Sequence, residues 1–431
     1  MSNRPVAAIL TLGCKLNLAD SEQIARALRA VGFETVDRPC EADAYVVNTC
    51  SVTHVADQKS RRLIRSVRRL SPSAVVAVTG CFPQGAGVEP VRELGADLVV
   101  GTRDHDKAEL VAFLTGVAAS RAKGAVAPPS RRRGLHTRAF IKAQEGCHDV
   151  CAFCIVPRTR GREESRPIAD VLAELRRAEE AGAREAVITG TQLGAWGRDL
   201  APALRPHHLI SAILEATRIS RIRFSSLQPQ DISPELLALW EDPRLMPHFH
   251  LALQSGSDAV LTAMRRRYNA TDFRMAADRI RAAVPDAAIT TDVIAAFPGE
   301  TEEDFEQTLQ LGRDVRFARL HCFPYSPRTK TAAARMPGQV PAPVRQARMA
   351  SLLALGQELS EAFQAQFAGA VRPVLWEQER PIDGVSAWFG HTDNYIPVLM
   401  PGEALHNRIT PVRLGAMNAD AMRGEPVGVA P

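Results

Sequence analysis

Residues 138–154 read RAFIKAQEGCHDVCAFC, an apolar segment that runs directly into three closely spaced cysteines. The segment predicts a β-strand over 138–144, and Cys147, Cys151 and Cys154 follow it on one short loop. A structural zinc site usually has four closed ligands in two CxxC pairs, and this loop has neither a fourth cysteine nor a second pair. Three thiolates on a four-iron cluster leave one iron open. The CxxxCxxC spacing therefore favours an iron–sulfur cluster over the zinc alternative.

Strand and helix patterns alternate after this loop. Six strands are expected, at 138–144, 186–190, 221–226, 248–253, 288–294 and 317–323. Helical patterns fill the intervals, for example over 167–181, 271–284 and 302–313. Six successive βα units predict an α/β domain over residues 138–365, built as a partial (βα)6 barrel of parallel strands.

Small or polar residues follow several of these predicted strands. Barrel enzymes place their chemistry at the carboxyl ends of the strands, so such residues are candidates for cofactor binding. Ordinary turn chemistry explains any one of them, but their recurrence favours a site. The candidates at strand ends are Thr191, Gln192, Ser225, Gln254 and Ser255.

A second strand–helix alternation occupies residues 1–118, with strands expected at 6–11, 44–48, 74–79 and 97–100. It predicts a small parallel sheet with crossover helices. Cys14, Cys50 and Cys81 each follow one of the first three strands. The carboxyl ends of parallel strands share one edge, so these thiols can converge there. The alternative is that each is a small buried apolar residue, as we interpret Cys40 and Cys322. Three strand-end positions favour a second cluster with an open iron.

Two further segments complete the domain organisation. Residues 119–137 carry several Arg and Lys and no acidic residue, and predict a basic linker. A long helix is expected over about 343–366. Short apolar segments broken by Gly and Pro then predict a small β-domain over 366–431, which is slightly acidic.

The 431 residues carry a formal net charge of +5, so total charge alone does not identify a nucleic-acid partner. No apolar run is long enough to span a bilayer. The apolar segment from Val6 to Leu12 is short and is followed by Lys15, which argues against a secretion signal. We therefore expect a cytoplasmic protein without membrane contact, whose cysteines bind metal rather than form disulfides.

Two three-cysteine sets in this order resemble the radical S-adenosylmethionine methylthiotransferase family over nearly the whole chain. The resemblance implies that the open iron at Cys147, Cys151 and Cys154 binds S-adenosylmethionine, which is cleaved to a 5′-deoxyadenosyl radical. Phe153 matches a family position near the adenine. The resemblance further implies that the set of Cys14, Cys50 and Cys81 holds an auxiliary [4Fe-4S] cluster carrying the sulfur that is methylated and transferred. The C-terminal β-domain corresponds to the family's TRAM domain, a small barrel associated with RNA.

Several local strings are most similar to the branch that modifies tRNA threonylcarbamoyladenosine. They include LGCKLN at 12–17, NTCSVT at 48–53, IRFSSL at 222–227 and LQSGSD at 253–258. Gln228 departs from the acidic residue expected after Ser-Ser-Leu. The implied reaction adds a methylthio group to carbon 2 of N6-threonylcarbamoyladenosine at position 37 of tRNA. Modification of prenyl-adenosine in tRNA or of an aspartate on a ribosomal protein, and a non-catalytic iron–sulfur RNA-binding protein, are the alternatives.

Basic residues close to both cysteine sets are candidates for contacts with tRNA phosphates. A solvated helix face is the alternative for any one of them. Radical chemistry driven by cofactors needs no conventional acid–base pair, so no catalytic side chain is nominated. A one-electron reductase or flavodoxin-like donor is an expected partner, and the sulfur donor is left open. The candidate phosphate-binding residues are Arg61, Arg62, Arg65, Arg328 and Lys330.

Overall fold

The computed structural model describes residues 4–121, 137–380, 386–418 and 420–427. Most of the predicted basic linker, including Lys123, Arg131, Arg132 and Arg133, lies outside these described residues. The chain divides into two compact units, which are treated separately. The first comprises Met1–Gly134, Glu145–Glu164 and Ser326–Ala334, and the second contains the remainder.

The first unit contains a five-stranded parallel sheet with the strand order β2-β1-β3-β4-β5. Its strands are β1 (Val6–Thr11), β2 (Glu34–Val36), β3 (Ala44–Thr49), β4 (Val75–Gly80) and β5 (Leu98–Val99). The central strands are buried on both faces, which explains their nearly continuous apolar sequences. The prediction of a small parallel α/β domain is confirmed.

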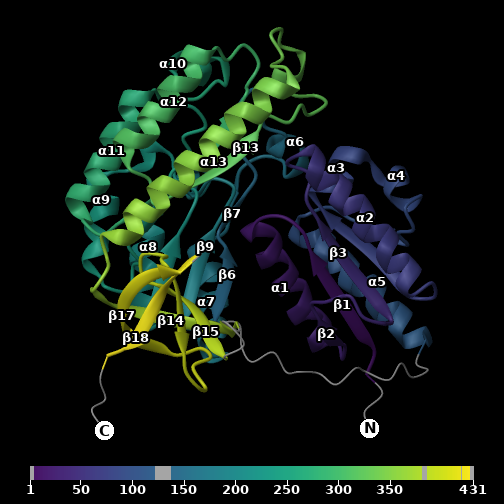
Figure 1. Cartoon of the computed structure of the whole chain (residues 1–431). Helices are drawn as coiled ribbons and strands as arrows, with labels where there is room; N and C mark the ends of the chain where they lie inside the picture. Colours follow the sequence, from purple (N-terminus) through teal and green to yellow (C-terminus); the bar gives the residue numbers. More distant parts are fainter. Residues whose placement is uncertain (1–3, 122–136, 381–385, 419, 428–431) are drawn as a thin grey trace. The chain divides into compact units, whose positions relative to one another are not determined.

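Helices cover both faces of this sheet (Figure 1). Residues of α1 and α5 share one apolar cluster with the sheet, and residues of α2 and α4 share the other. The helices of the unit are α1 (Lys15–Ala30), α2 (His54–Leu70), α3 (Cys81–Ala86), α4 (Val88–Arg92), α5 (Asp104–Arg121) and α6 (Val156–Thr159). With helices on both faces, the carboxyl edge of the sheet becomes the accessible place for ligands.

The second unit contains two three-stranded parallel sheets, β10-β9-β6 and β11-β12-β13. Single parallel bridges, Ile222 to Leu245 and Leu227 to Leu251, connect β10 to the segments around β11. The six strands therefore follow one another as a partial barrel, as expected. They are β6 (Arg138–Lys142), β9 (Glu185–Thr189), β10 (Arg221–Phe224), β11 (His248–His250), β12 (Ala288–Ala295) and β13 (Arg319–Pro324).

Helices of the second unit pack on the outer face of this partial barrel and bury its main apolar core. Alternate strand residues such as Ile188, Phe224 and Phe249 belong to that core. Their neighbours along each strand consequently point to the inner face, because strand side chains alternate. The larger helices are α7 (Ile168–Glu180), α8 (Pro206–Ala216), α11 (Ala270–Ala283), α12 (Glu302–Val315) and α13 (Ala342–Ala365).

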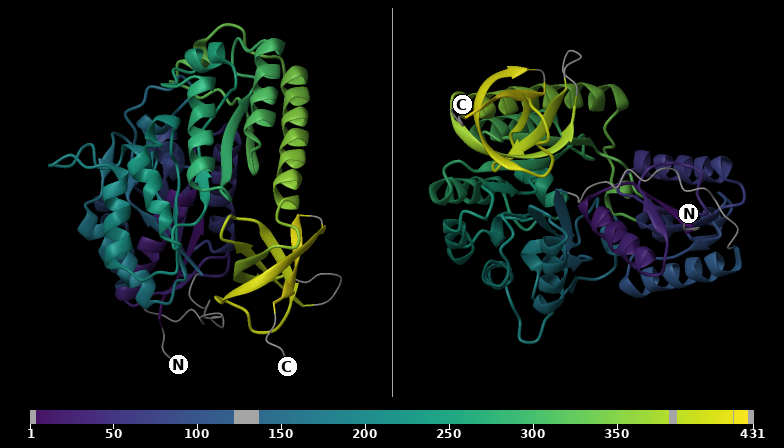
Figure 2. Two further views of the ribbon diagram at one scale, coloured as in Figure 1. Left: turned by 90° about the vertical axis from the view of Figure 1, so that its left-hand side faces the viewer. Right: turned by 90° about the horizontal axis from the view of Figure 1, so that it is seen from below.

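The C-terminal segment forms a closed five-stranded barrel with the order β14-β15-β16-β18-β17, drawn in yellow in Figure 2. Its strands are β14 (Val371–Glu379), β15 (Ala387–Thr392), β16 (Pro397–Pro401), β17 (Ile409–Asn418) and β18 (Ala421–Pro426). Trp376, Trp388 and Val398 lie in its apolar core. The predicted small β-domain is confirmed.

A buried charge network joins this barrel to the strands of the second unit. Glu185 is fully buried and accepts ion pairs from Arg138 at 2.6 Å and Arg223 at 2.9 Å. Burial alone would raise the pKa of Glu185, but the positive charges of Arg223 and Arg138 lower it to about 2. Arg221 and Arg223 donate to backbone carbonyls of the C-terminal barrel, for example to Pro373 at 2.6 Å. The network therefore fixes the C-terminal barrel within this unit.

Candidate functional site

Three cysteines follow adjacent strands of the first unit's sheet. Strands β1, β3 and β4 are neighbours, and their last residues share a register, with Thr11 opposite Asn48 and Asn48 opposite Thr79. The carboxyl ends of the three strands therefore form one edge. The cysteines that follow them at this edge are Cys14, Cys50 and Cys81.

The loops that carry the first two of these cysteines are packed closely together. Gly13 has a φ of +112°, and a Cβ atom placed there would lie 2.9 Å from the Cβ and 3.2 Å from the Sγ of Cys50. Only glycine allows this approach. The Nδ2 group of Asn17 donates to the carbonyls of Leu12 at 2.6 Å and Thr49 at 2.9 Å. Asn17 therefore holds the two loops at a fixed spacing.

The third cysteine begins α3 and is reached through another constrained glycine. Gly80 has a φ of +99°, and a Cβ atom there would lie 2.2 Å from the Thr49 carbonyl oxygen. Cys50 and Cys81 are both buried, whereas Cys14 is exposed. Burial raises the pKa of Cys50 to about 11 and also raises the pKa of Cys81. Two thiols of this set are thus shielded from solvent and one is open to it.

The second set lies on the loop before α6, and this loop belongs to the first unit. Its three cysteines are partly exposed. The Asp149 amide donates to the Sγ of Cys147 at 3.3 Å, and the Cys154 amide donates to the carbonyl of Cys151 at 3.2 Å. Burial raises the pKa of Cys147 to about 12. A tight turn with an amide directed at a sulfur suits thiolate ligands, because such hydrogen bonds stabilise negative charge on sulfur.

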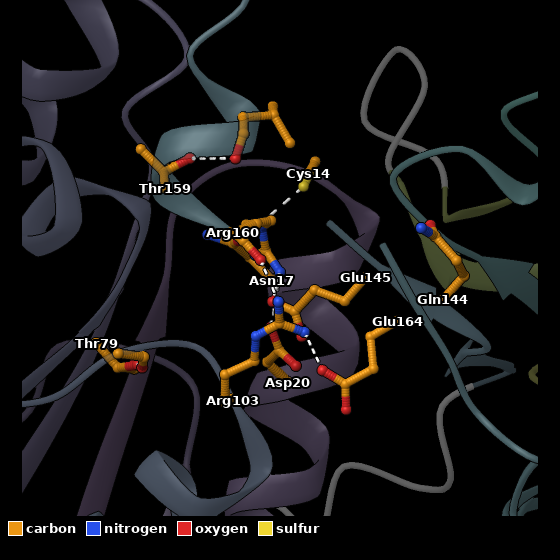
Figure 3. A network of polar contacts seen from close by, with 12 residues as sticks. Cys14, Asn17, Asp20, Thr79, Arg103, Gln144, Glu145, Thr159, Arg160 and Glu164 are labelled. Carbon is orange, nitrogen blue, oxygen red and sulfur yellow. Dashed lines mark hydrogen bonds and ion pairs between the residues drawn. The ribbon is translucent and has the colours of Figure 1, made fainter. Parts of the chain in front are cut away.

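The buried Arg160 lies near Asn17 and Cys14, one of the sheet-edge cysteines (Figure 3). Arg160 is 3% exposed and its Nη1 donates to Glu145 at 2.7 Å and lies 3.4 Å from the carboxylate of Asp20. Its Nη2 donates to the Oδ1 of Asn17. Asp20 in turn pairs with the buried Lys107 at 2.8 Å. Two cations and two carboxylates are thus buried together next to the cysteines.

Arg160 also acts on the thiol that begins α3. Burial raises the pKa of the Cys81 thiol, and the positive charge of Arg160 acts in the opposite direction. Helix α3, which begins at Cys81, packs against α6, which ends directly before Arg160. Burial alone would lower the pKa of Arg160, but the negative charges of Cys81, Asp20 and Glu145 raise it well above its usual value. A permanently charged guanidinium therefore faces the position where thiolates would carry negative charge.

The two three-cysteine sets can be compared with the ligands that a single metal ion and a four-iron cluster require. Among the described residues, no three His, Cys, Asp or Glu side chains gather closely enough to hold a single metal ion. Thiolates of a four-iron cluster bind different iron atoms, so they stand farther apart than the ligands of one ion. Three thiols beside a buried cation therefore fit an anionic cluster better than a closed zinc site.

Two predicted cofactor-binding residues follow β9 in the second unit. The Oγ1 of Thr191 is buried and has no hydrogen-bond partner among the described residues. The backbone amide of Gln192 donates to the side-chain oxygen of Gln144 at 3.0 Å, and Gln192 is buried. A buried hydroxyl without a partner is costly, so the Thr191 position is suited to a polar ligand atom.

The other candidates have internal hydrogen bonds. The hydroxyl of Ser225 donates to the Ile188 carbonyl at 3.2 Å, and that of Ser255, fully buried, bonds with Thr308 at 3.2 Å. Gln254 has a φ of +71°, and its backbone amide donates to the backbone carbonyl of Asp292 at 2.8 Å. These residues shape the strand ends. A role in cofactor binding stays a prediction for them and for the half-buried Phe153.

The predicted phosphate-binding residues fall into two environments. Arg61, Arg62 and Arg65 are exposed on α2 and line a shallow pocket with Gln58 and Arg69. This pocket is called the α2 arginine face below. Arg65 lies three or four residues from each of Arg61, Arg62 and Arg69, so these cations share one side of the helix and repel one another. Such a face is suited to an anionic partner.

Arg328 has a different environment. Its side chain is 11% exposed and donates to Asp57 at 2.8 Å and to Ser51, the residue after Cys50, at 2.8 Å. Lys330, by contrast, is exposed. The amide of Ala333 donates to the carbonyl of Ala152, between two cysteines of the second set. Segment 326–334 thus contacts both cysteine-bearing regions of the first unit.

Sequence reasoning missed Arg160, Asp20 and Lys107. Arg160 lies six residues after Cys154, in a stretch with several other arginines, and nothing in the string separates a buried arginine from an exposed one. Its partner Asp20 is 140 residues away. Only the fold brings these charges together.

The described residues contain no helix that is both long enough and apolar enough to cross a membrane.

Comparisons with known proteins concern the family and the fold of the chain. Residues 141–312 match the model of the radical SAM superfamily, and residues 6–101 match a family described as uncharacterized protein family UPF0004. In fold, the chain is similar to the radical S-adenosylmethionine methyltransferase TsrM from Kitasatospora setae, with a TM-score of 0.56 and 14% identity over 89% of this chain and 78% of that one.

Two curated relatives are more similar in sequence. The threonylcarbamoyladenosine tRNA methylthiotransferase MtaB of Bacillus subtilis is 34% identical over 94% of this chain and 93% of its own length. The tRNA-2-methylthio-N(6)-dimethylallyladenosine synthase of Thermobifida fusca is 37% identical over 87% of this chain and 78% of its own length. The chain therefore belongs to the family of radical S-adenosylmethionine tRNA methylthiotransferases and is a transferase.

Proposed function

We propose that this enzyme adds a methylthio group to carbon 2 of N6-threonylcarbamoyladenosine at position 37 of tRNA, with two [4Fe-4S] clusters and S-adenosylmethionine as cofactors. The observation that carries the proposal is the presence of two three-cysteine sets in one compact unit. One set follows three adjacent strands at a sheet edge, and the other lies on a single loop.

The proposal assigns one cluster to each set. Cys147, Cys151 and Cys154 would hold the cluster that binds S-adenosylmethionine, and Cys14, Cys50 and Cys81 would hold the auxiliary cluster. When bound, these groups supply the radical chemistry and the transferable sulfur. We propose that the side chains around the cofactor include Phe153, Thr191, Gln192, Ser225, Gln254 and Ser255.

The protein's own residues then hold, orient and shield these groups. Asn17 sets the spacing of the loops that carry Cys14 and Cys50. Asp149 directs its amide at the sulfur of Cys147. The exposed Cys14 leaves one side of the sheet-edge set open, which suits a reaction in which sulfur must leave that set.

The choice of threonylcarbamoyladenosine is supported by the inner face of the partial barrel. His250 hydrogen-bonds with Thr290 at 3.0 Å and lies 3.4 Å from the carboxylate of Asp292, and its ring is 5.7 Å from that of His321. These residues alternate with core residues of β11, β12 and β13. A polar lining suits the carboxylate, hydroxyl and urea groups of threonylcarbamoyl better than an apolar prenyl chain.

The second candidate substrate is prenyl-adenosine in tRNA. It is favoured by the relatives named as dimethylallyladenosine synthases, which are 35–37% identical to this chain. Percent identity therefore does not separate the two substrates. Coverage does not separate them either, since the MtaB relative matches over 94% of this chain and three of the synthases match over 97–100% of it. The strings around Cys14 and Cys50, however, resemble the threonylcarbamoyladenosine branch.

The tRNA backbone would contact the α2 arginine face. Arg62 and Arg65 are exposed there, and α2 begins four residues after Cys50. Phosphates on this helix would lie near the auxiliary set. We place the reaction in the cytoplasm, with electrons from a one-electron reductase or flavodoxin-like protein.

Mass spectrometry of two purified tRNAs tests the proposal. One carries threonylcarbamoyladenosine at position 37 and the other carries dimethylallyladenosine, and each is incubated anaerobically with reconstituted enzyme, S-adenosylmethionine, sulfide and reductant. The first nucleoside should gain a methylthio group and the second should not. Modification of only the second would reassign the substrate, and modification of neither, with cofactor cleavage intact, would contradict a tRNA substrate.

A further inference from the structure

We infer that Arg160 is a positioning residue for the auxiliary cluster: it donates a hydrogen bond to the sulfur of Cys81, balances thiolate charge and thereby raises the cluster's reduction potential. This inference rests on the proposed function, because it needs a cluster at Cys14, Cys50 and Cys81. It assigns an electrostatic task to a residue outside both cysteine sets.

The geometry of Arg160 leaves its guanidinium little freedom. The Nη1 group contacts the carboxylates of Glu145 and Asp20, and the Nη2 group donates to Asn17. Asn17 in turn donates to a carbonyl of the loop that carries Cys50. Arg160 is 3% exposed, so solvent screens its charge weakly. A fixed, buried cation therefore lies at the end of α6, which packs on the helix that Cys81 begins.

The buried charges of the surrounding network are balanced before any thiol ionises. Arg160 and Lys107 carry two positive charges, and Asp20 and Glu145 carry two negative ones. Asp104, which also pairs with Lys107 at 2.7 Å, is exposed. Each thiolate of a bound cluster adds negative charge to this buried site, and one-electron reduction adds another. A buried cation next to Cys81 and close to Cys50 stabilises the more negative form. Hydrogen bonds to cluster sulfurs and net charge are the protein's main means of setting such potentials.

The position of Arg160 in the chain adds a second consequence. It follows Cys154 by six residues, and α6 lies between them. The loop that carries the second cysteine set is therefore attached through α6 and Arg160 to the thiol that begins α3. The guanidinium also donates to Asn17, whose side-chain oxygen accepts from the Sγ of Cys14, so the segment of one set is connected to a ligand of the other.

A matched control separates electrostatics from simple attachment of the segment. Arg103 donates to the carbonyls of Arg160 at 2.8 Å and Arg162 at 3.0 Å and pairs with Glu164. It therefore anchors the same segment, but no contact with a cysteine is present for it among the described residues. Arg103→Gln loosens the segment, whereas Arg160→Gln removes the donor to sulfur.

The experiment measures the midpoint potential of the auxiliary cluster by redox titration followed by EPR. All variants are made in full-length protein that carries Cys147→Ala, Cys151→Ala and Cys154→Ala, so that one cluster remains. Arg160→Lys keeps the charge but loses the fork, and Arg160→Gln with Glu145→Gln removes one charge of each sign. We expect the double variant to lower the ratio of reduced to oxidised cluster at a fixed potential about tenfold. This corresponds to a midpoint potential that is lower by about 59 mV for one electron. Arg160→Lys should give a smaller shift, and Arg103→Gln should match the parent.

Iron and sulfide content is measured on the same samples. Unchanged potentials in both Arg160 variants with full iron content would overturn the inference. Selective loss of the cluster in the Arg160 variants, with Arg103→Gln retaining it and circular dichroism unchanged, would support the charge-balancing role. A parent that binds no iron at Cys14, Cys50 and Cys81 would contradict the proposed function itself, and the inference would fall with it.

Discussion

The two cysteine sets reach similar chemistry by opposite routes. The set of Cys147, Cys151 and Cys154 is local: eight residues of one loop bring its thiols together, with an amide directed at sulfur. The set of Cys14, Cys50 and Cys81 is dispersed over three strand ends and needs the complete sheet, two constrained glycines and Asn17 to assemble. A local set tolerates distortion of the sheet, whereas a dispersed set does not.

This difference also affects the surroundings of the thiols. In the dispersed set two thiols are buried, and a balanced network of buried charges lies beside them. The local set is partly exposed on all three cysteines. We therefore expect the dispersed set to depend on residues far away in sequence, and the local set to depend mainly on its own loop.

The largest expected effect separates the steps that the two sets serve. Cys151→Ala should reduce both cofactor cleavage and tRNA modification by more than about 100-fold, because one metal ligand is lost. Cys50→Ala should reduce tRNA modification equally but leave reductive cleavage of S-adenosylmethionine within about twofold, since the local set remains intact. Chromatography of 5′-deoxyadenosine and mass spectrometry of the nucleoside measure the two activities. Equal loss of cleavage in both variants would break the distinction between the sets.

The second prediction concerns the buried charge network around Glu185. Unlike the network beside the dispersed set, it contains no thiol. Glu185 has a folded pKa of about 2, below its ordinary value of 4.5. It therefore contributes stability that is present above about pH 4.5 and lost as pH falls toward 2, amounting to about 3 kcal/mol. Urea titrations of metal-free protein should show this loss in the wild type.

Glu185→Gln is the matched variant for that measurement. It cannot ionise, so the loss of stability between pH 5 and pH 2 should be smaller by about the same 3 kcal/mol. Iron binding at the dispersed set should be unchanged, since Glu185 lies in the second unit. Identical pH dependence in the two proteins would contradict the assigned role of the ion pairs.

The third prediction concerns Asn17, which holds together the loops of the dispersed set. Asn17→Ala leaves the buried carbonyls of Leu12 and Thr49 without donors and should destabilise the first unit by about 2 kcal/mol. Iron at the dispersed set should fall while the local set keeps its cluster. Asn269→Ala is a suitable control, because Asn269 caps α11 in the second unit and its loss costs about 1 kcal/mol without touching a cysteine. Equal iron loss in both variants would contradict the assignment.

The smallest effect is expected on the surface. Arg62→Ala with Arg65→Ala should weaken tRNA binding about tenfold and reduce the slope of log affinity against log salt by about 2, because two phosphate contacts are lost. Fluorescence anisotropy at several salt concentrations measures both. Cofactor cleavage should not change. Arg274→Ala, which removes an exposed ion pair with Asp314, is the control, and equal weakening by this variant would remove the α2 arginine face as a specific contact.

The fold could be predicted where the sequence pattern is strong. Strands β1, β3 and β4 are continuous apolar runs, and helices α7, α8, α11 and α12 have clear apolar periodicity. Strand β2 was not predicted, because it has three half-buried residues at the edge of the sheet. Strands β17 and β18 were not predicted either, since Gly415 and Gly424 interrupt their alternation and closure of the barrel stabilises them instead.

The cysteines of the candidate site could also be predicted, because each follows a recognisable strand or shares a short spacing. Its supporting charges could not. Arg160, Asp20 and Lys107 come from three distant segments, and their burial becomes apparent only after the sheet has folded. Arg328 illustrates the same limit, since its ion pair with Asp57, 271 residues away, was not predicted. Its contact with phosphate stays a prediction.

Iron analysis of two triple variants tests the central claim most directly. Wild-type protein reconstituted without oxygen should bind about eight irons per chain. The variant with Cys14, Cys50 and Cys81 changed to Ala, and the variant with Cys147, Cys151 and Cys154 changed to Ala, should each bind about four, and only the first should still cleave S-adenosylmethionine. Wild-type iron content in the first variant would contradict the claim that the dispersed cysteines hold a second cluster.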